Sequence, residues 1–300
     1  MEPKKMELKI FTLKFTTFKI LEQSLLFAFI SLTACKNDTV VTGVGAKGTV
    51  KNDNAEGDKK TTPTLPGQTQ PGQVAILPPE QANVSAKQAA LTVCNAPKES
   101  SERKTALQII SAYKLGTEKY DNATAIATPA ACIDSIRLAA IYVNLVSGVP
   151  ASTLIGQALQ ETGFCKSNLA QLARNFHGMK ATVDKKYFTN WAGEHYTKAS
   201  SESVTGEGNL VVSAFMKFTH PDFSFYSLAE RLIIPEYPYL KCIPKRNNTV
   251  EFMNCVGASW AVHGEYAKAV LGFRTTYKLE QCELTKNEWQ LNDKFKNISN

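Results

Sequence analysis

The sequence predicts a mostly helical α+β domain with a small β-lobe inserted in its middle. Apolar residues recur at helical spacing in residues 101–120, 132–148 and 150–162. Residues 187–219 are instead rich in Thr, Tyr, Phe, Val and Ser, and helical spacing returns after Pro221. Because one β-segment interrupts a series of helices, the pattern does not fit a doubly wound sheet.

The helix over 150–162 has clear ends. Pro150 stands at its start, a favoured place for proline, and Gly163 closes it. Residues 167–175 predict a further short helix, and residues 224–234 and 265–273 predict two more, the second being the last clear helix.

The β-lobe is predicted to be a hairpin. The run Gly206-Glu207-Gly208-Asn209 separates two strand-like runs. Such a glycine-rich tetrapeptide favours a turn between paired strands.

The N-terminus predicts an export signal. Lysines are scattered through the first 19 residues, and a short apolar run then ends at Cys35. That run is too short to span a bilayer. Leu32-Thr33-Ala34-Cys35 resembles a bacterial lipobox, so residues 1–35 are read as a lipoprotein signal peptide with Cys35 as the lipidated residue. An ordinary signal peptide with a coincidental cysteine is the alternative.

Residues 36–90 predict a flexible low-complexity tether, and residues 91–300 a single folded domain. The segment is rich in Thr, Gly, Asn, Lys, Gln and Pro, and no aromatic residue occurs between Cys35 and Tyr113. Such a composition has too little apolar surface to offset the entropy of ordering it. Lys36 after the cysteine favours an outer-membrane or periplasm-facing location, or release to the outside, over retention at the inner membrane.

The charge balance does not indicate a nucleic-acid partner. The chain has 34 basic and 27 acidic residues; five basic and three acidic ones lie in residues 1–35, which leaves +5 for the rest. This excess is spread without basic runs, whereas nucleic acid calls for a denser patch. We expect no nucleic-acid partner, no cofactor and a monomer.

The cysteines predict disulfides. Six of the seven remain after Cys35, and an even number in an exported chain favours pairing. The sequence leaves the connectivity open, although the fourth and fifth are close enough to staple one loop. No Cys-x-x-Cys spacing occurs and the four histidines are dispersed, so no metal site is expected. The six are Cys94, Cys132, Cys165, Cys242, Cys255 and Cys282.

Glu161 is the most informative position in the chain. It continues the helical row of Leu154 and Ala158, so it lies at the edge of the packed face. It also lies in the last turn, where the helix dipole disfavours negative charge. Both effects favour the protonated form, and a protonated carboxyl can act as a general acid. The alternative is a helix-end glutamate paired with Lys166.

Three linked segments follow one another around Glu161. They read Glu161-Thr162-Gly163-Phe164, then Ser167-Asn168-Leu169-Ala170, then Asn175-Phe176-His177-Gly178-Met179-Lys180. In this order they resemble the glucosaminidase family of cell-wall hydrolases, which includes autolysins and flagellar muramidases. The resemblance covers about residues 140–275. It implies a lysozyme-like α+β fold, a long cleft and cleavage of peptidoglycan glycan strands.

The resemblance also implies roles for individual residues. Glu161 is the acid that protonates the glycosidic oxygen. The family's second carboxylate, in the β-lobe, falls on Glu202, with Glu194 and Glu207 as nearby rivals. Six further side chains are implied to bind substrate: Phe164, Asn175, His177, Lys180, Trp260 and Tyr266.

The sequence departs from the family pattern at two of these positions. Trp260 stands where the family has a catalytic tyrosine, and an indole cannot relay a proton as a phenol can. Tyr266 matches a second tyrosine with a structural role, and His177 replaces a usual aromatic residue. The leading hypothesis is a peptidoglycan glucosaminidase or muramidase. The alternatives are a lytic transglycosylase using a single acid and a non-catalytic peptidoglycan-binding lipoprotein.

Overall fold

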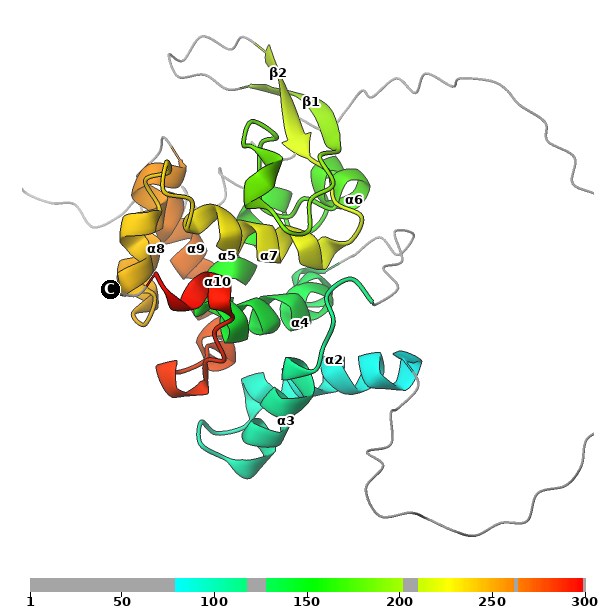
Figure 1. The fold of residues 1–300 in the computed structure, drawn as a ribbon, viewed down its shortest axis with the longest axis vertical. Coiled ribbons are helices and arrows are strands. Elements are labelled where there is room, and N and C mark those ends of the chain that lie inside the picture. Colours follow the sequence, from blue (N-terminus) through cyan, green and yellow to red (C-terminus); the bar gives the residue numbers. More distant parts are fainter. Residues whose placement is uncertain (1–78, 118–127, 202–209, 262–263, 299–300) are drawn as a thin grey trace, which may run out of the picture. The chain divides into compact units, whose positions relative to one another are not determined.

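The structure is a computed structural model that describes residues 79–117, 128–201, 210–261 and 264–298. Helices dominate these segments, and two strands form one small sheet (Figure 1). The α-helices are α2 (Pro79–Asn95), α3 (Ser101–Ser111), α4 (Pro129–Ser147), α5 (Ala151–Thr162), α6 (Asn168–Ala173), α7 (Pro221–Leu232), α8 (Thr249–Trp260), α9 (Tyr266–Thr276) and α10 (Asp293–Lys296). The strands are β1 (His195–Ser201) and β2 (Leu210–Met216).

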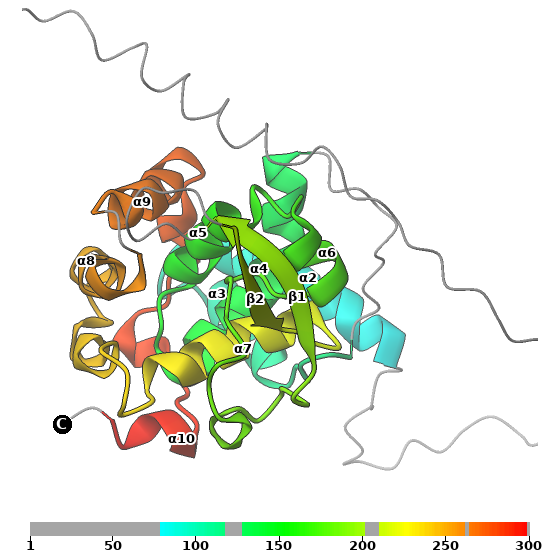
Figure 2. The ribbon, with the colours of Figure 1, turned by 90° about the horizontal axis from the view of Figure 1, so that it is seen from above.

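The core of the fold is built around α4 and α5. Thr128 caps the start of α4 by accepting a hydrogen bond from the Ala131 backbone N–H, and Gly148 ends the helix in the left-handed conformation. α4 is long and apolar enough to cross a bilayer, but 67% of that stretch is buried inside the fold. It is therefore the central helix of a packed domain, with α5 and α7 against it (Figure 2).

The β-hairpin was predicted from the turn at 206–209 and is confirmed. β1 and β2 pair antiparallel with Ser201 opposite Leu210, and the turn itself lies outside the described residues. In Figure 1 the hairpin lies at the end of the folded unit opposite α2 and α3. A bridge between Lys180 and Phe215 joins the segment after α6 to β2. The predicted α+β class is thus correct.

Close packing of α9 against two other helices brings distant segments together. A Cβ on Gly156 of α5 would lie 2.8 Å from Cγ1 of Val270 on α9, and a Cβ on Gly257 of α8 would lie 2.8 Å from Cβ of Ala267. Only glycine permits these approaches. As a result, the end of α8 and the start of α9 both lie beside the end of α5.

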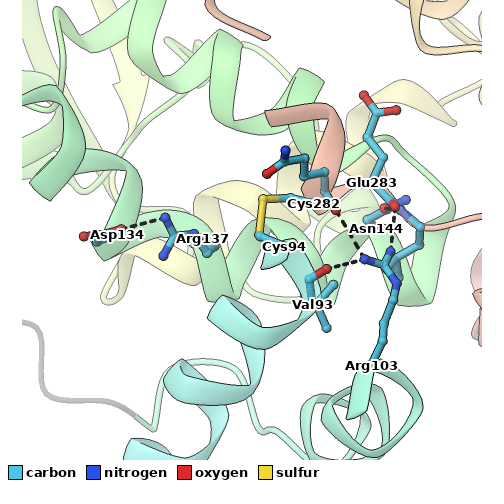
Figure 3. Close-up of a disulfide and its surroundings, with 10 residues drawn as sticks. Val93, Cys94, Arg103, Asp134, Arg137, Asn144, Cys282 and Glu283 are labelled. Atoms are coloured by element: carbon cyan, nitrogen blue, oxygen red, sulfur yellow. Dashed lines mark hydrogen bonds and ion pairs between the residues drawn. A yellow bond between two sulfur atoms is a disulfide. The ribbon is translucent and has the colours of Figure 1, made fainter. Parts of the chain in front are cut away.

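All six cysteines predicted to pair are in disulfides. The bonds join Cys94 to Cys282, Cys132 to Cys165 and Cys242 to Cys255. Figure 3 shows the first, which links α2 to the 3₁₀ turn Leu279–Cys282. Beside it the buried guanidinium of Arg103 donates to the carbonyl oxygens of Val93 and Glu283 and pairs with Glu288. The segment from Cys282 to Glu288 is therefore fastened to α2 and α3.

The folded unit begins earlier than the sequence suggested. α2 starts at Pro79, inside the stretch assigned to the tether. Ala86, Ala89 and Ala90 are buried, because small residues at helical spacing let α2 approach its neighbours closely. Residues 1–78, with the predicted signal peptide and lipidated Cys35, lie outside the described residues.

Candidate active site

Glu161 lies near the end of α5 and accepts two hydrogen bonds on the same oxygen. The Tyr266 hydroxyl donates to Oε1 over 2.7 Å, and the Trp260 indole N–H donates to Oε1 over 3.0 Å. These donors come from the start of α9 and the end of α8. The partners of Glu161 are therefore Tyr266 and Trp260, and not Lys166 as the alternative interpretation had it.

Burial raises the pKa of Glu161 above its ordinary value, and the hydrogen bonds from Tyr266 and Trp260 oppose that rise. The net direction is upward. Because Oε1 already accepts two hydrogen bonds, we infer that the proton of the neutral carboxyl lies on Oε2. A Cβ on Gly178 would lie 2.7 Å from Oε2, so this oxygen faces the loop containing Gly178.

Tyr266 is held as a donor. Gln157, one turn before Glu161 on α5, donates from Nε2 to the Tyr266 hydroxyl over 3.4 Å. With its oxygen occupied as an acceptor, the hydroxyl turns its own proton towards Glu161. Burial and the neighbouring carboxylate raise the pKa of Tyr266 well above its ordinary value, so it stays protonated. Tyr266, predicted to bind substrate and matched to a tyrosine with a structural role, thus contacts the carboxyl of Glu161 directly.

The loop opposite Oε2 is held by Asn175. Its Nδ2 donates to the carbonyl oxygens of Met179 (2.8 Å) and Met216 (2.9 Å), and its Oδ1 accepts from the Met179 N–H (3.1 Å). Asn175 is completely buried. Predicted to bind substrate, it instead fixes the loop around Gly178 to the end of β2, because its amide is fully used inside the protein.

His177 also lies in the interior and not in a cleft. Its Nε2 is 3.2 Å from the Leu154 carbonyl, which can only accept, so Nε2 carries the proton. Nδ1 then accepts from the Ser224 hydroxyl over 3.1 Å. Burial lowers the pKa of His177 to about 3, which keeps the ring neutral. Its predicted substrate-binding role is therefore wrong, because the ring is completely buried.

The turn after Glu161 has an unusual backbone. Gly163, Phe164 and Cys165 follow one another with φ values of 55°, 63° and 65°. The left-handed region is strained for bulky residues such as Phe. Two contacts hold it: the disulfide from Cys165 to Cys132, and edge-on packing of Phe164 against Phe273 at 5.4 Å. Phe164, predicted to bind substrate, thus anchors this turn to α9.

Glu161 opens into a cleft of about 420 Å³. Gly178, Trp260, Tyr239, Phe215 and Leu169 form part of its wall. Three basic side chains line it as well: Lys180, Lys198 of β1 and Arg231 of α7. Lys180 and Trp260, both predicted to bind substrate, thus line the same cleft as Glu161, and their binding role stays a prediction.

Glu161 is the one carboxyl among the described residues that line this cleft. Glu202 and its rival Glu207 lie outside the described residues. The other rival, Glu194, is exposed and pairs with Lys217 over 3.4 Å. It is not part of the cleft wall.

Sequence reasoning missed Gln157, Tyr239, Lys198 and Arg231. No motif in the sequence marks these four residues. They reach the site only because helix packing and strand pairing bring them beside Glu161. Alternation along β1 could have indicated Lys198, since it shares a face with Tyr196, which packs on the small cluster of Leu169, Ala173 and Phe215.

The described residues hold no group of three His, Cys, Asp or Glu side chains placed to bind a metal ion. The chemistry that the arrangement supports is proton donation. The carboxyl of Glu161 is partly buried, has a raised pKa and lines a cleft, and its Oε1 oxygen accepts two hydrogen bonds. General acid catalysis needs such a group.

Comparison with known proteins finds one family and several solved structures. The family described as mannosyl-glycoprotein endo-beta-N-acetylglucosaminidase, or glucosaminidase, matches residues 138–279. The catalytic domain of the autolysin Auto from Listeria monocytogenes is 17% identical, with 62% of this chain and 99% of that chain covered and a TM-score of 0.42.

Two further structures are similar at the same level. A peptidoglycan hydrolase mutant from Sphingomonas sp. A1 is 21% identical, with coverage of 52% of this chain and 97% of that one and a TM-score of 0.41. A truncated glycoside hydrolase domain of FlgJ from Salmonella typhimurium is 18% identical, with coverage of 50% and 98% and a TM-score of 0.39. The comparison with curated proteins found no match.

Proposed function

We propose that this chain, whose residues 138–279 match the glucosaminidase family, cleaves the glycan strands of peptidoglycan with Glu161 as the general acid. The observation that supports this assignment most is the state of Glu161. Its pKa is raised by burial, and it lies in the wall of a cleft.

The proton on Oε2 is the one that is transferred. As the glycosidic bond breaks, the leaving oxygen gains negative charge and takes this proton. The carboxylate that remains is stabilised at once by the Tyr266 and Trp260 donors on Oε1. The two donors thus stabilise the carboxylate that forms after proton transfer, while burial stabilises the neutral carboxyl before it.

The direct test is Glu161→Gln, which keeps the shape of the side chain but removes the acidic proton. We expect cleavage of purified peptidoglycan to fall by about 10²–10⁴-fold, the usual contribution of general acid catalysis. Binding of the glycan should persist. Glu236→Gln is the matched control, because Glu236 is an exposed glutamate that accepts a hydrogen bond from Tyr187. A Glu161→Gln protein with full activity would refute the proposal.

For the second carboxylate we propose Glu202, acting as the base that activates water. A lytic transglycosylase is the second candidate, because Glu161 is the one carboxyl among the described cleft residues and that reaction needs a single acid. Glu202→Gln separates the two. A dead variant supports hydrolysis, whereas an active variant that forms anhydro-muramic products supports transglycosylation. Mass spectrometry of the products also distinguishes glucosaminidase from muramidase cleavage.

For the location we propose an exported lipoprotein anchored through Cys35, which would place the cleft within reach of the wall. Three disulfides are consistent with an oxidising compartment outside the cytoplasm.

A further inference from the structure

The cleft around Glu161 contains three cations and one carboxyl among the described residues. The cations come from separate parts of the chain: Lys180 follows the Gly178 loop, Lys198 lies on β1 and Arg231 lies near the end of α7. Three elements of different sequence therefore converge on one basic wall. A neutral sugar chain alone gives no reason for such a wall.

Arg231 indicates what this wall binds. Its guanidinium lies 4.9 Å from the ring centre of Tyr237 and 5.6 Å from that of Trp260, so its position is fixed by two aromatic faces. The Nε and Nη1 atoms are buried, and within the described part of the chain no acceptor meets them. Buried N–H groups without an acceptor are costly. Because the Arg231 side chain also lines the cleft, a ligand oxygen is the acceptor that we expect for them.

A guanidinium stays charged at every working pH, so an N–H that it offers to a ligand favours a carboxylate over a neutral hydroxyl. Lys198 adds a mobile ammonium from the hairpin side of the same cleft. The anion must lie close to the sugar whose bond is cut, because the same cavity of about 420 Å³ also holds Glu161. This volume is at the small end of ligand cavities.

We propose that the cleft recognises a free carboxylate on the sugar itself, namely the lactyl group of muramic acid, and that strands stripped of their stem peptides are the preferred substrate. This inference rests on the proposed function. The lactyl group is an amide while it holds a peptide and becomes a carboxylate when that amide is hydrolysed. Water adds across the C–N bond, leaving the carboxylate on the sugar and the amine on the peptide. An amide hydrolysis of this class therefore supplies the substrate.

Binding of defined strands tests the proposal without requiring turnover. The full chain with Glu161→Gln is titrated with three glycans free of wall phosphate polymers. They are strands with free lactyl carboxylates, the same strands with the carboxylates converted to methylamides, and strands with intact stem peptides. Because no cleavage is needed, a failure of the proposed chemistry and a failure of anion recognition give separate results.

We expect the free carboxylate to bind more tightly than the methylamide and the peptide-bearing strand. A partly solvated charge pair is worth up to about fivefold in affinity, so Lys198→Gln should reduce that preference about two- to fivefold, with Lys198→Arg restoring it. Arg231→Gln should reduce it more, because the Arg231 guanidinium is less exposed to solvent. High salt should also weaken the preference.

Lys104→Gln is the matched control, since Lys104 is an exposed lysine of α3 that pairs only loosely with Glu99, at 4.0 Å. It should leave the preference unchanged. Equal affinity for carboxylate and methylamide strands would overturn the proposal. So would tighter binding of peptide-bearing strands, which would place the recognised anion on the peptide, or a preference that survives both cleft substitutions.

Discussion

Tyr266→Phe should move the pH dependence of catalysis without removing the acid. The substitution deletes one hydroxyl, whose 2.7 Å hydrogen bond to Oε1 of Glu161 stabilises the carboxylate form. That hydrogen bond lowers the pKa of Glu161, and burial raises it. Without the hydroxyl the charged form is less favoured, so the pKa of Glu161 should rise further.

The size of the shift follows from the strength of that bond. A hydrogen bond contributes about 1.5–3 kcal/mol when its acceptor is charged and about 0.5–1.5 kcal/mol when its acceptor is neutral. Losing the hydroxyl therefore disfavours the carboxylate relative to the neutral carboxyl by about 1 kcal/mol, and the pKa of Glu161 rises. A general acid works only while protonated, so activity falls as pH rises through the pKa of Glu161. In Tyr266→Phe this decline should occur at higher pH than in the unmodified protein.

The measurement is kcat/KM on purified glycan strands across the range from acidic to alkaline pH. Tyr187→Phe is the matched control, because its hydroxyl donates to Glu236 over 2.5 Å at the protein surface. That variant should leave the alkaline decline where it is in the unmodified protein. A decline that stays in place in Tyr266→Phe, or moves to lower pH, would refute the assignment of the acid to Glu161.

Three further predictions address the same site and the anchor. Gly178→Ala should reduce kcat more than about tenfold relative to Gly163→Ala, as measured by steady-state kinetics. Both glycines have positive φ (61° and 55°), so the backbone cost of the two substitutions is similar. Of the two, only Gly178 would place a Cβ against Oε2 of Glu161. Glu161→Gln should raise the melting temperature at pH 7–8, with a difference that shrinks towards pH 4. The folded state holds the Glu161 proton more tightly than the unfolded state, so the unmodified protein loses stability as pH rises from the unfolded pKa through the raised folded pKa. Cys35→Ser should release the chain from the membrane fraction or leave its precursor unprocessed, and unchanged membrane association on fractionation would contradict lipid anchoring.

Much of the fold could be predicted because its signals are local. The helix over 150–162 has its start, its apolar face and its closing glycine within one short stretch of sequence. The hairpin has its turn between two strand-like runs. By contrast α8 was not predicted, since Gly257 lowers the helical signal of its sequence. That glycine is explained only by the close approach of Ala267 on α9.

The site could be predicted in part for the same reason. Glu161 could be singled out because its position on α5 and its neighbours along the chain point to one chemistry, and its role as the acid stays a prediction. The roles of His177 and Asn175 could not be judged, because a loop residue facing the interior and one facing the cleft look alike in sequence. Both side chains are completely buried and hydrogen-bonded inside the protein.

The departure at Trp260 has a physical meaning once Tyr266 is placed. The sequence places Trp260 where the family has a catalytic tyrosine, and an indole cannot relay a proton as a phenol can. In the structure the phenol reaching Glu161 is Tyr266, and Trp260 supplies a second donor to the same oxygen. An indole N–H donates but does not accept, so it cannot take the proton from Glu161. Both donors thus stabilise the carboxylate through Oε1, which leaves Oε2 to hold the proton that we propose is transferred. Replacing the phenol by an indole therefore preserves electrostatic support for the acid while removing one route by which its proton could be lost to the protein.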